Sequence, residues 1–493
     1  MEKFDVAVIG GGVLGCFAAR NLARYRFRVA VFEKNADVCT EISRANTAII
    51  YSGYDNKPGT LKARLCVRAN RDFDRLCGEL GVPFKRCGSL MAAFGPRGER
   101  VLRQKMEQGL ANGVPELKLL SAAEALAIEP GLNPMVTLAL YAPSTGTVNP
   151  WELGIAAIEN AVDNGAELFL DTKVAGISPA EGGYRIDAGD GRFEARAIVN
   201  CSGLYADKIS EMVAKPYFRI APTRGDYIIL DTKAGGAVRH IGFLEPEERG
   251  KGATIVPTVD GNVMLGPSEE PLSGEADFST SESGLAFVRG RSMELIPNIP
   301  LEHTIRSFAA LRPNPFFAEC DASRSVTLSE RGIDDFLIGS TEGHPLFINL
   351  AGVKTPGLTC ANEIGGYVTE LLLERLGGAA ANPAYRPVRP AGPRFSRLAP
   401  EERKALAGPQ RIVCRCREVT EEEVRNAIRR VPGATTVDGV KRRTGAGMGR
   451  CQGGFCTQRV IEILAEELGK PVTDIRKDAE GSYLLTQARG DRS

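Results

Sequence analysis

The apolar positions at the start of the chain form two short runs on either side of a glycine-rich turn. Residues 4–9 and 28–32 are apolar runs that predict buried strands, while residues 13–24 have the spacing of a helix. The turn carries three glycines, Gly10, Gly12 and Gly15. Glu33 ends the second strand. Glycines at this spacing permit a tight turn and a close approach of the backbone to a pyrophosphate, and an acid at the strand end suits a ribose. The pattern therefore predicts a dinucleotide site.

The hydrophobic pattern changes character further along the chain. Residues 151–164 predict a helix, and residues 167–170 and 197–201 predict strands of the same kind as the first two. Residues 221–231 and 251–266 are instead rich in β-formers with turn residues between them, which is typical of antiparallel strands. We therefore expect an α/β nucleotide-binding domain that is interrupted by a mixed or antiparallel substrate domain.

The charge balance excludes several classes of function. Lys and Arg number 62 against 61 Asp and Glu, for a formal net charge of +1, so nothing predicts binding to nucleic acid or to an anionic membrane.

The sequence has no apolar run of about 18 residues and no basic leader, and we expect neither a membrane span nor a signal peptide. Most of the 12 cysteines are scattered, as in reduced cytosolic proteins. We expect a cytoplasmic protein, peripheral to a membrane only through a partner.

The remaining cysteines form a quartet near the C-terminus, Cys414, Cys416, Cys451 and Cys456. The second pair lies in the glycine-rich stretch 445–456, where the backbone can wrap closely around a cluster. Four thiolates in such loops suit a [2Fe–2S] cluster. A structural zinc ion is the alternative, but zinc sites usually have two residues between paired cysteines, so the spacing favours iron–sulfur.

Several arginines lie close to the quartet in the sequence: Arg415, Arg417, Arg442, Arg443 and Arg450. Cations around a cluster oppose its negative charge and raise its reduction potential. The same arginines also suit a solvated face or a dock for an acidic partner.

The combination of one dinucleotide site and one cluster favours FAD over NAD. The chain has a single glycine fingerprint, so it holds one dinucleotide. A cluster carries electrons singly, and a flavin converts a two-electron oxidation into single electrons whereas a nicotinamide does not. We therefore expect FAD beside a [2Fe–2S] cluster.

Three segments, 41–54, 222–227 and 348–359, resemble the FAD-dependent amine and hydroxy-acid oxidoreductases, the family that contains D-amino-acid oxidase. With the quartet, the chain most resembles the branch of anaerobic glycerol-3-phosphate dehydrogenase catalytic subunits, which end in a BFD-like ferredoxin domain. The resemblance implies an interrupted Rossmann-like FAD-binding domain, an antiparallel-sheet substrate domain and a small α-helical C-terminal [2Fe–2S] domain.

The domain boundaries follow from the same resemblance and from composition. We expect the oxidoreductase part at 1–376, a proline-rich linker at 377–410, the BFD-like domain at 411–470 and a tail at 471–493. Within the oxidoreductase part, the FAD-binding segments are expected at about 1–85, 145–215 and 330–376, and the substrate-domain segments at about 86–144 and 216–329.

The resemblance also implies which residues contact FAD. Those expected around the ADP half, the pyrophosphate and the ribityl chain are Gly10, Gly12, Gly15, Glu33, Lys34, Ser43, Thr47, Val174 and Gly203. Those expected beneath the isoalloxazine are Gly352, Thr355, Pro356, Gly357, Leu358 and Thr359. A helix beginning there stabilises negative charge on a reduced flavin.

A dehydrogenase of this family needs an anchor for an anionic substrate and a group that handles the hydroxyl or amine proton. Arg312 is the expected anchor, because guanidinium binds carboxylate or phosphate bidentately, and Arg224 is a second candidate. Where relatives that oxidise hydroxyl groups carry a histidine, this chain has Tyr51, a poor base at neutral pH. His344 is a substitute by its place in the sequence, and Tyr51 packing against the flavin is the plainer reading.

The sequence therefore predicts an FAD-dependent dehydrogenase for a small anionic substrate. The first expectation is oxidation of glycerol 3-phosphate to dihydroxyacetone phosphate, with electrons passing through the cluster to a partner redox subunit or acceptor protein. The alternatives are an amino- or imino-acid, opine or 2-hydroxy-acid dehydrogenase of the same family. A non-enzymatic iron–sulfur assembly module is the alternative from a different class.

Overall fold

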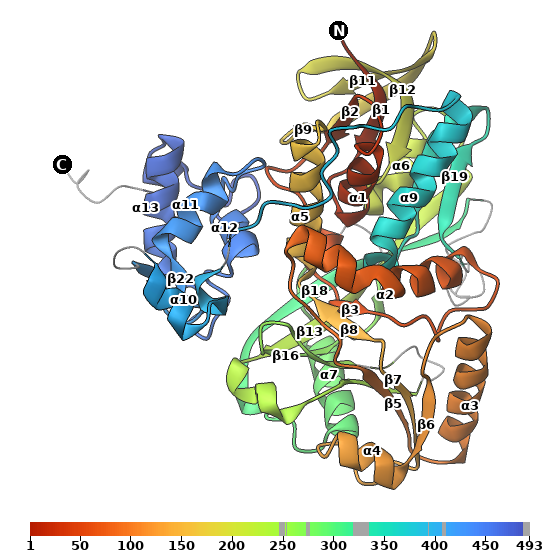
Figure 1. Cartoon of the computed structure of the whole chain (residues 1–493), viewed down its shortest axis with the longest axis vertical. Helices are drawn as coiled ribbons and strands as arrows, with labels where there is room; N and C mark the ends of the chain where they lie inside the picture. The colour runs from red at the N-terminus through yellow and green to blue at the C-terminus, as the bar shows by residue number, and fades with distance from the viewer. Residues whose placement is uncertain are drawn as a thin grey trace.

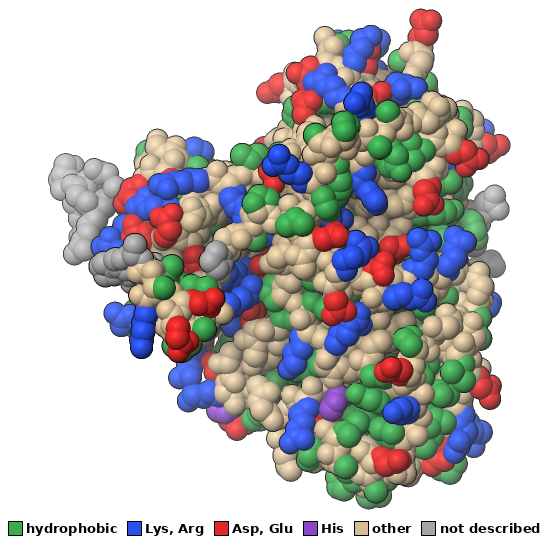
Figure 2. Space-filling model, in the orientation of Figure 1, with side chains coloured by type: hydrophobic (Ala, Val, Ile, Leu, Met, Phe, Trp, Pro, Cys, Tyr) green, Lys and Arg blue, Asp and Glu red, His purple; other side chains and the backbone are tan. Residues whose placement is uncertain are grey.

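A computed structural model describes residues 1–245, 252, 254–272, 277–318, 335–392, 394–406 and 411–486. Figure 1 shows two lobes built on sheets, stacked along the long axis, and a small helical domain at one side that contains the C-terminus. No helix in these ranges is both long and apolar enough to cross a membrane. Figure 2 shows acidic and basic side chains interspersed over the visible face, in keeping with the net charge of +1.

The first lobe is built on an eight-stranded sheet whose main order is β10-β11-β12-β1-β2-β9, with β20 joining at β12 and β19 pairing with β20. Its strands are β1 (Glu2–Ile9), β2 (Val29–Phe32), β9 (Glu167–Phe169), β10 (Val174–Ala180), β11 (Gly183–Ala188), β12 (Gly191–Asn200), β19 (Leu337–Thr341) and β20 (His344–Ala351). β1, β2, β9, β12 and β20 are parallel to their neighbours in the centre, while β10, β11 and β19 pair antiparallel. The centre is the doubly wound core that a Rossmann-like fold requires.

Helices from distant parts of the chain cover this sheet. They are α1 (Val13–Leu22), α2 (Leu61–Leu80), α5 (Pro150–Asp163), α6 (Ala206–Ser210) and α9 (Gly357–Leu376). α1 packs against both α5 and α9, and their apolar faces share one core with β1 and β2. α1 begins directly after the glycine turn, and Gly12, at the N-terminal end of the helix, has no side chain to cap its first turn. The sheet and these helices together place that end at the carboxyl edge of the parallel strands.

The second lobe is a nine-stranded sheet in the order β17-β13-β16-β15-β14-β5-β7-β6, with β18 on β13. Its strands are β5 (Ser89–Ala93), β6 (Lys118–Ser121), β7 (Leu138–Ala142), β13 (Phe218–Leu230), β14 (Ile241–Leu244), β15 (Thr254–Pro257), β16 (Val263–Gly266), β17 (Glu270–Pro271) and β18 (Thr304–Phe317). All pairs but β5–β14 are antiparallel. α3 (Pro96–Ala111), α4 (Ala122–Ile128) and α7 (Glu282–Leu295) pack against it. The expected fold class is confirmed: an interrupted nucleotide-binding fold with a mainly antiparallel second sheet.

A small sheet joins the two lobes, formed by β3 (Ile49–Ile50), β4 (Phe84–Lys85) and β8 (Gly146–Val148). The C-terminal domain has its own apolar core and consists of β21 (Ile412–Cys414), β22 (Val419–Thr420), α11 (Glu421–Arg429), α12 (Val437–Thr444) and α13 (Cys456–Leu468), with α10 (Pro400–Ala405) preceding it. Residues 377–392, part of the expected linker, run back over the first lobe. There Arg389 pairs with Glu159 and donates to the carbonyl of Leu80 at 3.0 Å.

Candidate active site

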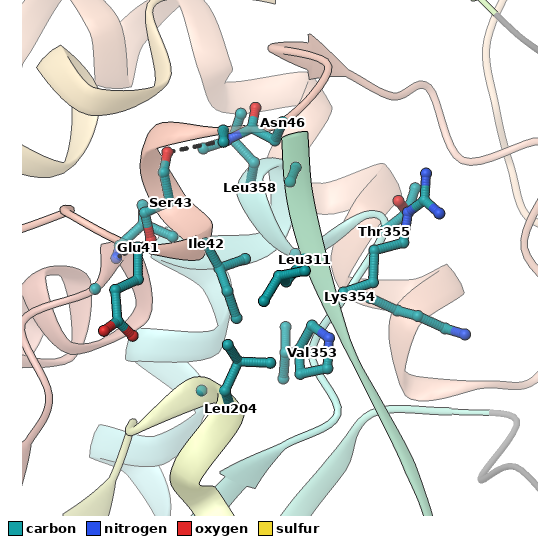
Figure 3. A pocket seen from close by; sticks show the side chains of 18 of the residues that line it. Glu41, Ile42, Ser43, Asn46, Leu204, Leu311, Val353, Lys354, Thr355 and Leu358 are labelled. Carbon is teal, nitrogen blue, oxygen red and sulfur yellow. Dashed lines mark hydrogen bonds between the residues drawn. The ribbon is translucent and has the colours of Figure 1, made fainter. Parts of the chain in front are cut away.

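A cavity of about 1360 Å³ opens between the carboxyl edge of the first sheet and the second sheet. Its lining combines the glycine turn after β1, the segment after β2, the segment between β20 and α9, and residues of β13 and β18. Figure 3 shows how these segments converge, with Ile42, Leu204, Leu311 and Val353 around the same space. Such a crevice at the strand ends is where doubly wound folds bind dinucleotides.

The glycine turn needs its glycines for steric reasons. Gly10 has a φ of +104°, and a Cβ there would lie 2.7 Å from the carbonyl oxygen of Cys201. A Cβ on Gly15 would lie only 1.9 Å from the carbonyl oxygen of Gly10, so helix α1 would have to move away from β1. Gly12 and Val13, at the N-terminus of α1, line the cavity. A pyrophosphate placed there meets the positive end of the helix dipole.

Two side chains fix the loops around this turn. Glu33 is buried, accepts the N–H of Gly11 at 2.7 Å and that of Asn35 at 2.9 Å, and lines the cavity. Burial raises the pKa of its carboxyl group. The Ser43 hydroxyl accepts the N–H of Val13 at 2.9 Å, while its carbonyl oxygen accepts the Asn46 side-chain amide at 3.0 Å. Figure 3 marks the second of these bonds.

The cavity brings together most of the residues expected to contact FAD. Its lining includes Gly10, Gly12, Glu33, Lys34, Ser43, Thr47, Val174, Gly203, Gly352, Thr355, Pro356, Gly357 and Leu358. Gly15 lies behind the turn, where it packs the helix onto the strand. Thr359 is buried, and its hydroxyl accepts the backbone N–H of Tyr51 at 3.0 Å. Both of these residues support the cavity wall without lining it.

The segment after β20 forms the wall of the cavity next to the second sheet. Gly352 has a φ of +62°, and a Cβ there would lie 2.1 Å from Cγ of Pro315. α9 begins at Gly357, and no side chain caps its first turn. The positive end of this helix therefore faces the cavity, where it favours negative charge on a bound ring.

The expected substrate residues are separated by the structure. Arg312 and Tyr51 line the cavity. Arg312 forms an ion pair with Glu269 at 3.4 Å, and the Tyr51 hydroxyl lies 3.5 Å from that of Thr47. Arg224 does not line the cavity, because its guanidinium is bound to Glu270 at 2.8 Å and to Asp277 at 2.5 Å.

His344 also lies outside the cavity lining, and this corrects its assignment as a substitute base. It is the first residue of β20, whereas the cavity wall begins after the last residue of that strand, Ala351. Eight residues of extended chain span about 23 Å. The imidazole instead lies 6.0 Å from the Tyr184 ring, at the opposite edge of the sheet.

Sequence reasoning missed Lys354, which lines the cavity near Arg312. Its ammonium group donates to the side-chain carbonyl of Asn314 at 2.6 Å. Asn314 lies two residues after Arg312 on β18, so both side chains project from the same face of the strand. The only available signal was its place within segment 348–359, because the contact to β18 joins residues 40 positions apart.

The cysteine quartet is arranged as two pairs of thiols. The sulfurs of Cys416 and Cys451 lie 3.7 Å apart, and Cys414 is hydrogen-bonded to Cys456. Two sulfurs bound at about 2.3 Å to one tetrahedral metal lie about 3.8 Å apart. Two thiols at each of two positions fit a two-iron cluster better than one zinc ion.

The backbone around the quartet favours thiolates. The pKa of Cys414 is lowered to about 6 by the hydrogen bond with Cys456 and by backbone N–H groups. The pKa of Cys451 is lowered mainly by the N–H of Phe455 and also by that of Gly453. The pKa of Cys456 is instead raised, by the hydrogen bond with Cys414 and by burial. Iron requires thiolate ligands, and the lowered pKa values make Cys414 and Cys451 the two that these loops prepare for it.

The C-terminal domain is attached to the first lobe by a buried ion cluster. Asp37, in the loop after β2, accepts two hydrogen bonds from Arg443 at 2.8 Å and two from Arg442 at 2.9 and 3.3 Å. Arg442 also pairs with Asp478, which reaches Arg44 at 2.9 Å. The side chains of Asp37, Arg442 and Arg443 are 3%, 4% and 4% exposed. These two arginines therefore connect domains and do not form a collar around the cysteines.

Replacing Asp37 by Asn should loosen this attachment by about 3 kcal/mol, because two buried guanidinium groups lose their shared carboxylate. The two arginines lower the pKa of Asp37 to about 2 from an ordinary value of 3.8. A lowered pKa stabilises the protein above pH 3.8, and about 2 kcal/mol is lost as the pH falls from there through 2. Calorimetry of the C-terminal transition across pH 2–7 should show this step in the native protein and a flatter profile in Asp37→Asn. The exposed control Asp190→Asn should match the native protein.

The comparisons with known proteins agree with this arrangement. The sequence pattern of the FAD dependent oxidoreductase family matches residues 5–371, and that of the BFD-like [2Fe-2S] binding domain matches residues 412–466. A glycerol 3-phosphate dehydrogenase of Caloramator mitchellensis is 44% identical over 98% of each chain. A glycerol 3-phosphate oxidase of Mycoplasma genitalium is 27% identical over 76% of this chain and 95% of its own. The FAD-bound L-alpha-glycerophosphate oxidase structure from Mycoplasma pneumoniae aligns with a TM-score of 0.72 and 26% identity, covering 79% of this chain and 99% of its own.

Proposed function

Because this chain belongs to the FAD-dependent oxidoreductase family and ends in a BFD-like [2Fe–2S] domain, we propose that it oxidises glycerol 3-phosphate to dihydroxyacetone phosphate. Its cofactors are FAD and a [2Fe–2S] cluster. The glycine turn, Glu33 and the start of α9 would hold FAD, which when bound accepts a hydride from the substrate. The relatives named for glycerol 3-phosphate support this substrate among those of the family.

The observation that carries the proposal is the pair of cations beside the flavin segment. Arg312 and Lys354 both line the cavity, and Lys354 is bound to Asn314 on the same strand face as Arg312. A phosphate monoester carries close to two negative charges at neutral pH, and two cations from different elements suit it better than one. In the structure Arg312 forms an ion pair with Glu269, and in our proposal the substrate phosphate replaces this carboxylate as the partner of Arg312.

The hydroxyl proton has no histidine to receive it in the described part of the cavity wall. His240 is bound to Glu129, and neither it nor His303 or His344 lines the cavity. In our proposal the Tyr51 phenol, 3.5 Å from the Thr47 hydroxyl, orients the substrate hydroxyl by hydrogen bonding. Its backbone is fixed by Thr359, so the phenol has a defined position at the cavity wall.

The same observation favours a second candidate, a small amino or imino acid. A neutral amine gives up hydride without an alkoxide-like step, so it needs less help from a base than a hydroxyl does. Arg312 alone suits the single carboxylate of such a substrate.

We further propose that electrons leave through the C-terminal cluster to a partner protein, one at a time. The domain is held against the first lobe through Asp37, on the loop that also carries the cavity residues Glu41 and Ser43. Among described residues no second dinucleotide fingerprint offers an internal acceptor. An external acceptor completes the proposed circuit.

An anaerobic titration of the purified holoenzyme tests the substrate. Glycerol 3-phosphate should bleach the flavin band and produce the EPR signal of a reduced cluster at micromolar to millimolar concentration. Glycerol, which lacks the phosphate, should require a concentration at least about a hundredfold higher, since it forgoes two charged contacts. Bleaching by proline and not by glycerol 3-phosphate would replace the first candidate by the second.

A further inference from the structure

The two thiol pairs differ in their exposure to solvent. Cys414 and Cys456 are each 2% exposed, whereas Cys416 is exposed and Cys451 is partly exposed. One end of the cluster site is therefore buried in the domain core and the other faces solvent. Figure 1 shows the domain projecting from the side of the molecule, so a second protein can approach it.

An apolar anchor lies beside the exposed pair. Phe455 immediately precedes Cys456 and is 78% exposed, although its backbone N–H donates to the sulfur of Cys451. The adjacent Gly454 is exposed and has no side chain, so the Phe455 ring stands out from the surface beside it. Exposure of a large aromatic ring to water is unfavourable in the free protein. Aromatic residues also contribute much of the binding free energy at protein interfaces.

The structure divides the five arginines near the quartet into two groups. Arg442 and Arg443 are bound to Asp37, and Arg417 is bound to Asn262 at 2.8 Å. Arg450 pairs with Asp231 at 3.3 Å but is 61% exposed. Arg415, which lies between two ligands in the sequence, is exposed and forms no ion pair or side-chain hydrogen bond with the described residues. Of these five arginines, Arg415 and Arg450 thus present charge to solvent beside the exposed thiols.

We propose that Arg415, Cys416, Arg450, Gly454 and Phe455 form a cluster face that docks an acidic one-electron acceptor protein. The inference rests on the proposed function. The positive charge of Arg415 selects an acidic surface, Phe455 anchors it, and the exposed pair Cys416–Cys451 is the nearest part of the site to the docked protein. A [2Fe–2S] cluster held by the four cysteines would give one electron to the docked protein in each encounter. Two encounters follow each substrate oxidation, and the substrate protons pass to water.

The test measures binding and needs no turnover. The dithionite-reduced holoenzyme is immobilised, and an acidic blue-copper protein in its reduced form is passed over it at 20–300 mM salt. Arg415→Glu should weaken binding about fivefold to tenfold at low salt, and the difference should shrink at high salt. Phe455→Ala should weaken binding at least about tenfold at every salt concentration.

Matched controls are far from the cluster. Arg100→Glu on α3 and Met135→Ala, at a site that is 72% exposed, should each change binding less than twofold. Basic cytochrome c should bind Arg415→Glu more tightly than the native protein. Equal binding of the copper protein to Arg415→Glu and the native enzyme at low salt, with an intact cluster EPR signal, would overturn the proposal. Because dithionite and not the substrate reduces the enzyme, the binding result can be interpreted even if glycerol 3-phosphate fails to reduce the flavin.

Discussion

Replacing Arg312 and Lys354 together by methionine is expected to lower kcat/KM for glycerol 3-phosphate by about 10³-fold while FAD stays bound. Each hydrogen bond between charged partners is worth about 1.5–3 kcal/mol, and the double variant removes both cations from the same end of the cavity. Methionine keeps the length and apolar packing of the two stems. Anaerobic stopped-flow reduction of the flavin measures the loss, and the flavin absorbance of the resting protein reports cofactor content.

The matched control is Arg224→Met on the neighbouring strand. Arg224 precedes Gly225 on β13, and its guanidinium is engaged by Glu270 and Asp277 outside the cavity lining. We expect flavin reduction within about threefold of the native rate. A second comparison uses glycerol, whose slow reaction should be nearly unchanged in the double variant because it has no phosphate to lose. An equal loss with both substrates would mean that the cations support the flavin and do not select the anion.

The two single variants separate the first candidate substrate from the second. A phosphate that uses both cations should suffer from either substitution, whereas a carboxylate held by Arg312 alone should be insensitive to Lys354→Met. The ion pair between Arg312 and Glu269 adds a further expectation. Glu269→Gln should tighten the binding of the anion severalfold, because the arginine no longer has to leave a carboxylate before it meets the substrate.

The nucleotide half of the site was predictable because its determinants are local. The glycine turn, the helix that follows and Glu33 lie within one short segment. At Gly10 and Gly15 the lack of a Cβ permits a close contact, with the strand beside β1 or within the same unit. Local sequence fixes such a unit almost completely. The FAD contacts after β20 came from resemblance, and the cavity brings them to the same space.

The substrate half was less predictable because it depends on strand pairing over long separations. Thr223 lies opposite Arg312 and Arg224 lies opposite Leu311, so the two arginines project from opposite faces, and a slip of β18 by one residue would bring both to the same face. Nothing in the sequence fixes that register. His344 was chosen for its nearness in sequence to the flavin segment, but an extended strand carries it to the far edge of the sheet.

The arginines around the quartet show the same limit for charges. Their positions in the sequence are compatible with a collar around the cluster. The partners that decide their role, Asp37, Asn262 and Asp231, lie far away in the sequence and meet them only in the folded chain. Four of the five arginines thus contact residues outside the domain, and only the fold distinguishes these from the outward-facing Arg415.

Serine in place of Cys414 is expected to remove the cluster while leaving the flavin site intact. A serine oxygen is a harder ligand than a thiolate, and Cys414 is the buried ligand whose pKa is most favourable for iron binding. Iron content and the EPR signal of the dithionite-reduced protein should fall below about a tenth of native values. Glycerol 3-phosphate should still bleach the flavin at the native rate, because the quartet contributes no residue to the cavity lining. Electron delivery to any protein acceptor should be lost.

The control for this variant is Cys87→Ser, a buried thiol next to the second sheet whose pKa is raised by burial to about 11. It should keep iron, flavin and electron delivery.

Metal analysis of the native protein decides between the two occupants of the quartet. One zinc ion per chain without iron would contradict the cluster, and it would leave the domain as a docking element attached through Asp37. Two irons and two sulfides per chain, lost together in Cys414→Ser but not in Cys87→Ser, would tie the electron exit to the thiol pairs. The decisive result is that Cys414→Ser affects one half-reaction and not the other. If the cluster relays electrons from outside the cavity, the substrate reduces the flavin at the native rate in this variant, but the flavin cannot pass its electrons to a protein.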